Sequence, residues 1–77
     1  MRAKYVMTEL GPILFPETMK HSDFKDFSPT SAGIVTVTGK IVVTSGHSLT
    51  LNLKSEPGDS RLIKISLNIQ PKEVSWV

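Results

Sequence analysis

The sequence predicts an α+β fold, in which a four- to five-stranded, mainly antiparallel sheet carries one C-terminal helix packed on one face. A β-branched stretch over 34–53, interrupted by glycines, shows the period of two that is typical of strands. Two shorter apolar runs, 3–9 and 12–16, precede it and add strands to the sheet. A segment from residue 57 onward opens with proline and glycine and then places apolar residues at helical spacing.

The first two runs predict a hairpin. Tyr5 and Met7 share one face of the 3–9 run, because alternate residues of a strand point the same way. A glycine before the 12–16 run permits the chain to reverse. Prolines at both ends of that run lack a backbone donor, so we expect it at the edge of the sheet.

The segment from residue 16 to residue 33 predicts little regular structure. Pro16 followed by Glu17 favours a single helical turn. The run over 28–33 is rich in serine, proline and glycine, which is typical of a loop. Phe24 and Phe27 are spaced for one face of a short helix, and we expect them to cap one end of the core.

The 34–53 stretch predicts a meander of three strands, over 34–38, 41–44 and 48–53. Gly39 supplies the positive φ for a tight turn between the first two strands. In the third strand leucine alternates with polar residues, so we expect one aliphatic face made by the residues Leu49, Leu51 and Leu53.

The last third of the chain predicts a helix from about Pro57 to Leu67. Pro57 and Asp59 favour a helix entrance, and the aliphatic face of the sheet needs a cover. A strand remains the alternative for 57–69, because Ile63 and Ile65 also fit an alternating pattern that continues to residue 69. We expect one domain over 1–69 and a C-terminal tail over 70–77.

Length and composition exclude several protein classes. The 77 residues suffice for one domain with a small core, and the absence of cysteine excludes disulfides and cysteine-bound metals. No apolar run approaches the ~20 residues of a membrane span, and a cytoplasmic location is expected. The net charge of +2 is spread along the chain rather than gathered in a stripe, so nucleic acid is not an expected partner. Small sheets without disulfides or a structural metal often complete their hydrophobic core by associating with another chain. The sequence therefore predicts a homo-oligomer.

No catalytic site, metal site or cofactor is expected. His47 and Ser48 are neighbours on a predicted strand, so their side chains point to opposite faces and do not share a proton. His21 has carboxylates nearby in the sequence, but one histidine in a loop falls short of the three or four convergent ligands of a metal site.

Short fragments spread over most of the chain up to Leu67 carry a resemblance. They include Glu9-Leu10-Gly11-Pro12-Ile13, Gly46-His47-Ser48-Leu49-Thr50-Leu51 and Ser55-Glu56-Pro57-Gly58-Asp59. With these fragments the chain resembles small uncharacterised α/β proteins of phage and bacterial genomes. The resemblance implies a phage or mobile-element accessory protein, and it implies no particular activity.

The leading functional hypothesis is a non-enzymatic protein–protein interaction or assembly module. Its contacts would come from sheet edges and from Phe24, Phe27 and Trp76, since exposed aromatic side chains anchor interfaces. The alternative is a protein that binds a small ligand, an anion or nucleotide, with the 45–48 turn and the helix N-terminus at 57–60. Its candidate residues are Ser48, Lys54, Gly58, Ser60 and Arg61.

Overall fold

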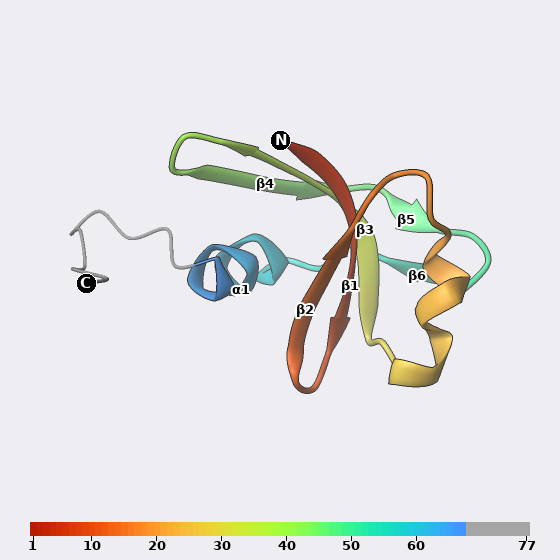
Figure 1. Ribbon diagram of the computed structural model, residues 1–77. Coiled ribbons are helices and arrows are strands. Elements are labelled where there is room, and N and C mark those ends of the chain that lie inside the picture. Colours follow the sequence, from red (N-terminus) through yellow and green to blue (C-terminus); the bar gives the residue numbers. More distant parts are fainter. Residues whose placement is uncertain (68–77) are drawn as a thin grey trace, which may run out of the picture.

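The computed structural model describes residues 1–67, and it confirms a small α+β fold with a four-stranded antiparallel sheet and a C-terminal helix (Figure 1). The four strands of this sheet are β1 Arg2–Thr8, β2 Gly11–Phe15, β3 Ser31–Thr38 and β4 Ile41–Ser45. A 3₁₀ helix, η1, spans His21–Phe27 between β2 and β3. A separate two-stranded sheet pairs β5, His47–Ser48, with β6, Leu53–Lys54, and the helix α1 spans Asp59–Ser66.

The strand order is β2-β1-β3-β4, so β2 and β4 are the two edges of the main sheet. The predicted hairpin of the first two runs is confirmed, with Tyr5 opposite Leu14. Its edge position is also confirmed, and Pro12 explains it, because a proline in a central strand would lack a hydrogen-bond donor.

The hairpin between β3 and β4 is confirmed as well, with Thr38 opposite Ile41. Gly39 has a φ of +59° at the first central position of the turn, as type II′ turns require. β3 begins earlier than expected, at Ser31, because its first residues pair with β1 (Tyr5 lies opposite Gly33). The sequence interpretation of 28–33 as loop is therefore wrong for its last three residues.

The third strand of the predicted meander is wrong. β5 and β6 pair with each other, and residues 49–52 between them form a turn. Gly46 and Asn52 both have positive φ, and the Asn52 N–H donates to the Leu49 carbonyl at 3.2 Å. The turn leaves Leu49 84% exposed, whereas an inward position was expected from the alternation.

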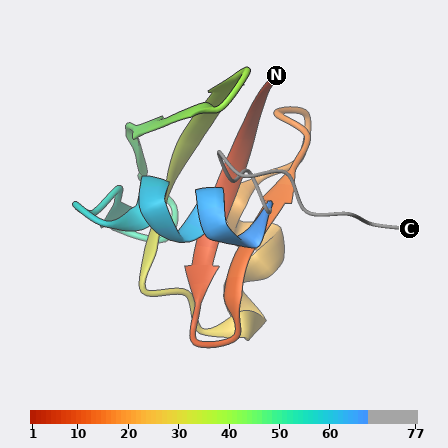
Figure 2. The ribbon, with the colours of Figure 1, turned by 90° about the vertical axis from the view of Figure 1, so that its left-hand side faces the viewer.

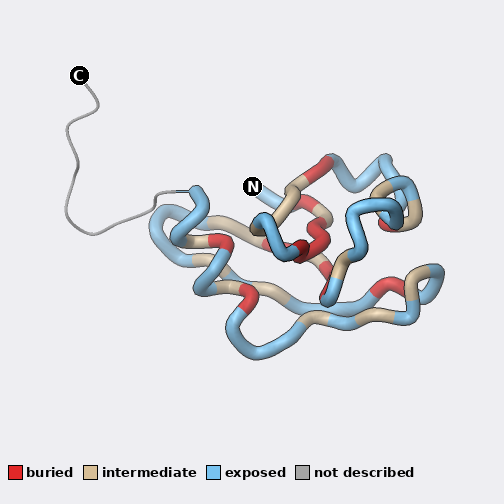
Figure 3. Tube along the Cα trace, turned by 90° about the horizontal axis from the view of Figure 1, so that it is seen from below, coloured by how far each residue is buried: buried red, intermediate tan, exposed pale blue. Residues whose placement is uncertain are grey.

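Hydrophobic side chains gather on both faces of the main sheet. On one face the buried cluster consists of Ala3, Tyr5, Met7, Val35 and Ile63. On the other face it consists of Val6, Phe15 and Ala32, against which the partly buried residues Ile13, Phe24, Leu51 and Leu53 pack. α1 thus contributes to the first face, while η1 and the β5–β6 segment contribute to the second. Figure 2 shows α1 crossing the strands, and Figure 3 shows how few positions of the chain are buried.

α1 confirms the predicted C-terminal helix and excludes the strand alternative for residues 59–66. Ile63 is fully buried, whereas Ile65 is 53% exposed, as expected when the two residues lie on different faces of a helix. The predicted tail, 70–77, lies outside the described residues, and so do residues 68 and 69 of the predicted domain.

Candidate functional site

The outer edge of β4 is the first candidate, because its composition differs from that of the other edge. Within residues 1–67 no strand pairs with this edge. Ile41 is 65% exposed and Val43 is 54% exposed, and β4 contains neither proline nor a charged residue. An edge strand presents backbone N–H and C=O groups to any strand that approaches it, and native proteins usually blunt such edges with charge or proline. β4 lacks both of these protective features.

A second candidate is the aromatic group at η1, where two of the predicted interaction residues lie. Phe24 is half-buried and stacks on Phe15, with ring centroids 4.2 Å apart and planes at 28°. Phe27 lies 6.1 Å from Phe24 and is 53% exposed. Phe24 therefore belongs mainly to the packing of the sheet, and Phe27 offers the more accessible ring. Trp76, the third predicted interaction residue, lies outside the described residues.

The start of α1 is occupied by a carboxylate of the chain itself. Asp59 is buried, and its Oδ2 accepts hydrogen bonds from the Glu56 N–H at 2.9 Å and from the Tyr5 hydroxyl at 2.6 Å. Burial of the phenol, followed by the bond to Asp59, raises the pKa of Tyr5 well above its usual range. A buried carboxylate in the first turn already complements the positive end of the helix dipole. An incoming anion would be repelled there.

The structure brings two of the residues predicted to bind an anion into one hollow. Ser48 and Lys54 line a common hollow of about 360 Å³, together with Glu56. Gly58, Ser60 and Arg61 are absent from that lining. The Ser48 hydroxyl is buried and serves the turn, since it accepts from the Leu51 N–H at 3.3 Å and lies 3.3 Å from the Thr50 hydroxyl.

A neighbouring hollow of about 340 Å³ gathers basic residues that the sequence interpretation did not connect. It lies on the second face of the sheet, and the residues that line it are Lys4, Lys20, His21, Ile34, His47, Ser48, Leu49 and Thr50. They come from β1, from the start of η1, from β3 and from the β5 turn. No spacing in the sequence joins these segments, so only the fold could have identified the group.

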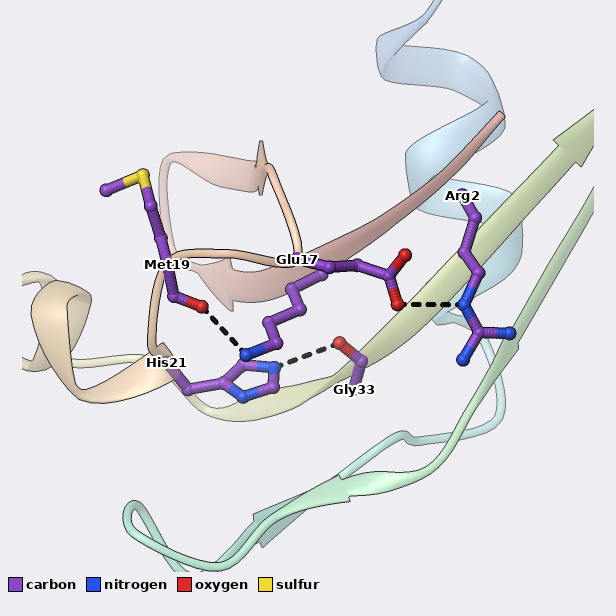
Figure 4. Close-up of polar contacts among 6 residues, drawn as sticks. Arg2, Glu17, Met19, His21 and Gly33 are labelled. Atoms are coloured by element: carbon purple, nitrogen blue, oxygen red, sulfur yellow. Dashed lines mark hydrogen bonds and ion pairs between the residues drawn. The ribbon is translucent and has the colours of Figure 1, made fainter.

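Two residues of this basic hollow are held in place by backbone carbonyls. The Lys4 ammonium donates to the Met19 carbonyl at 2.7 Å. His21 is buried, and its Nε2 lies 2.9 Å from the Gly33 carbonyl oxygen (Figure 4). Because that oxygen can only accept, the bond assigns the proton to Nε2. The rings of His21 and Phe15 also form a T-shaped pair, with centroids 5.5 Å apart.

A histidine–serine nucleophile pair finds no support in the geometry at β5. His47 is exposed, whereas Ser48 is buried and its hydroxyl accepts a hydrogen bond from the Leu51 N–H. Among residues 1–67 no group of three or more histidine, aspartate and glutamate side chains is arranged to hold a metal ion. No helix in this same range is long and apolar enough to cross a membrane.

Comparison with known proteins identified no matching family model, no similar curated protein and no similar solved structure.

Proposed function

We propose that this protein is a non-enzymatic assembly module that associates with a second copy of itself through the outer edge of β4. The observation that carries the proposal is the exposed, uncharged and proline-free character of this edge strand. Such edges template strand addition, because backbone hydrogen bonds supply affinity without requiring a particular partner sequence.

The other edge of the sheet supports the choice of β4 by contrast. β2 contains Pro12, and Pro16 follows its last residue. Proline on an edge strand removes a donor and discourages pairing with another chain. The β2 edge thus contains proline and the β4 strand does not, as expected if a second copy pairs with β4 only.

A second copy suits β4 because the strand is complementary to itself. β4 has five residues, so a full-length antiparallel pairing with its own copy is centred on Val43. Val42 then lies opposite Thr44 of the second copy, and Ile41 lies opposite its Ser45. No like charges face each other, and pairs of β-branched residues stabilise antiparallel neighbours. The two sheets would join into one continuous sheet with closed symmetry.

The small size of the hydrophobic core gives an energetic reason for two copies to associate. The buried hydrophobic residues among the described part of the chain are Ala3, Tyr5, Val6, Met7, Phe15, Ala32, Val35 and Ile63. A set this small leaves a narrow margin of stability, which association commonly supplements in domains of this size. Pairing at β4 would cover Ile41 and Val43, two large hydrophobic side chains that are more than half exposed.

Sedimentation equilibrium over a range of protein concentrations tests this proposal. Wild type is expected to show a concentration-dependent dimer, and Val43→Lys is expected to remain a monomer, because it places like charges opposite each other at the centre of the pairing. Leu10→Lys is the matched control, since Leu10 is 94% exposed at the β1–β2 turn, away from β4. A wild-type protein that stays monomeric at every concentration contradicts the proposal.

A further inference from the structure

We infer that the basic hollow between the start of η1 and the β5–β6 turn binds a small phosphorylated molecule. This inference is independent of association through β4, because the hollow lies on the face of the sheet and not at its outer edge. It shares Ser48 with the anion site predicted from the sequence, which used the 45–48 turn and the helix start at 57–60, but it does not include that helix start.

The charge of the hollow favours an anion. Two lysines, Lys4 and Lys20, contribute to its lining, and no aspartate or glutamate among the described residues does so. The carboxylates nearest in sequence to Lys20 already have partners. Glu17 pairs with Arg2 at 2.8 Å (Figure 4), and Asp23 accepts from the Lys20 backbone N–H at 3.1 Å.

The lysine on β1 is positioned before any ligand arrives. Lys4 is half-buried in a central strand of the sheet, and its ammonium is fixed by the Met19 carbonyl. An ammonium has three donors, so two remain for a ligand oxygen. A preorganised cation loses little side-chain entropy on binding, which favours affinity. Lys20 is exposed and supplies a second positive charge to the lining of the hollow.

The size and the apolar part of the lining define the ligand further. A volume of about 340 Å³ falls at the lower end of the range for small-molecule sites and exceeds the needs of a bare phosphate ion. Ile34 and Leu49 add apolar surface beside the charged groups. We therefore assign the hollow to a phosphate monoester whose organic part is small and apolar or aromatic. The lysines hold the phosphate as point charges.

Isothermal titration calorimetry with phenyl phosphate, inorganic phosphate and phenol tests the assignment on the full chain at low salt. Phenyl phosphate is expected to bind more tightly than inorganic phosphate, and phenol is expected to show no binding. Lys4→Gln and Lys20→Gln should each weaken phenyl phosphate binding by roughly tenfold or more, because each removes a charged donor. Lys25→Gln is the matched control, since Lys25 is an exposed lysine of η1 outside the lining of the hollow.

Three results would overturn the assignment. The first is no heat from millimolar phenyl phosphate, and the second is equal affinity for phenyl phosphate and inorganic phosphate. The third is a loss of affinity in Lys25→Gln as large as that in Lys20→Gln, which would indicate general attraction to a cationic surface. If Lys4→Gln fails to fold, Lys20→Gln still decides the outcome, because Lys20 is exposed and its side chain is not part of either buried cluster.

Discussion

The Tyr5 hydroxyl donates a hydrogen bond to the Asp59 carboxylate at 2.6 Å, across 54 positions of the sequence. Both residues are buried, Tyr5 completely and Asp59 with 4% of its surface exposed. The bond joins the central strand β1 to the first residue of α1. It therefore couples the position of the helix to the sheet, and it explains why a charged residue is tolerated in the interior.

Tyr5→Phe is expected to destabilise the protein by about 1.5–3 kcal/mol, because a buried carboxylate loses one of its donors while the ring remains packed. Urea denaturation followed by circular dichroism measures the change. An unchanged midpoint of unfolding would show that the bond contributes nothing to stability.

The Tyr5–Asp59 hydrogen bond is also expected to make the free energy of unfolding depend on pH. Burial and Asp59 raise the pKa of Tyr5 above its unfolded value of about 10, so the folded protein retains the phenol proton more strongly. The contribution of the Tyr5–Asp59 hydrogen bond to the free energy of unfolding is then complete below about pH 10. It is lost as the pH rises above that value.

Tyr5 is the single tyrosine of the chain, so tyrosinate absorbance follows this group alone. Its titration midpoint should be higher in native buffer than in concentrated urea. Tyr5→Phe should lose less stability than wild type in the same alkaline range. Equal midpoints in the native and denatured protein would refute the expected shift.

Ile63→Ala and Ile65→Ala form a matched pair on α1. Ile63 is fully buried in the cluster with Tyr5 and Val35, so its truncation should cost about 2–5 kcal/mol. Ile65 is 53% exposed, and its truncation should cost much less. Thermal and urea unfolding of both variants test the difference. Similar losses at the two positions would contradict the observed orientation of the helix.

Gly33→Ala is expected to destabilise the sheet strongly. A Cβ at this position would collide with the Ser45 carbonyl oxygen and approach the Tyr5 ring to 3.3 Å. Ser31→Ala in the same strand is the control, because the buried Ser31 hydroxyl has no hydrogen-bond partner among residues 1–67 and its removal should be neutral or stabilising. If urea unfolding showed Gly33→Ala to be more stable than Ser31→Ala, the strands around residue 33 would accommodate a Cβ without loss of stability. That result would contradict the prediction.

Local patterns were sufficient to predict most of the main sheet. The alternation of Tyr5 with Val6 places them in clusters on opposite faces, and Gly39 marks the β3–β4 turn. These features depend on neighbours in the sequence, which is why the sequence alone contains them.

The errors have a shared physical cause, namely that tertiary or turn interactions override the strand pattern. The alternating leucines after His47 predict a strand, but the Ser48 hydroxyl and the positive φ of Asn52 stabilise a turn in its place. Gly33 was predicted in a loop, yet it belongs to β3, where it pairs with Tyr5 of β1. The basic hollow joins Lys4, Lys20 and His47, whose separation in the sequence leaves no local signal.

The chain contains no cysteine, so one substitution can report self-pairing directly. Val43→Cys places a single thiol at the centre of the proposed antiparallel pairing, where it faces its own copy. Ile41→Cys is the matched control, because residue 41 would lie opposite Ser45 of the second copy, although Ile41 is at least as exposed as Val43. The decisive measurement is the rate of covalent dimer formation under mild oxidation, read on a non-reducing gel. Association through β4 predicts rapid cross-linking of Val43→Cys and much slower cross-linking of Ile41→Cys, whereas equal, slow rates for the two variants would contradict it.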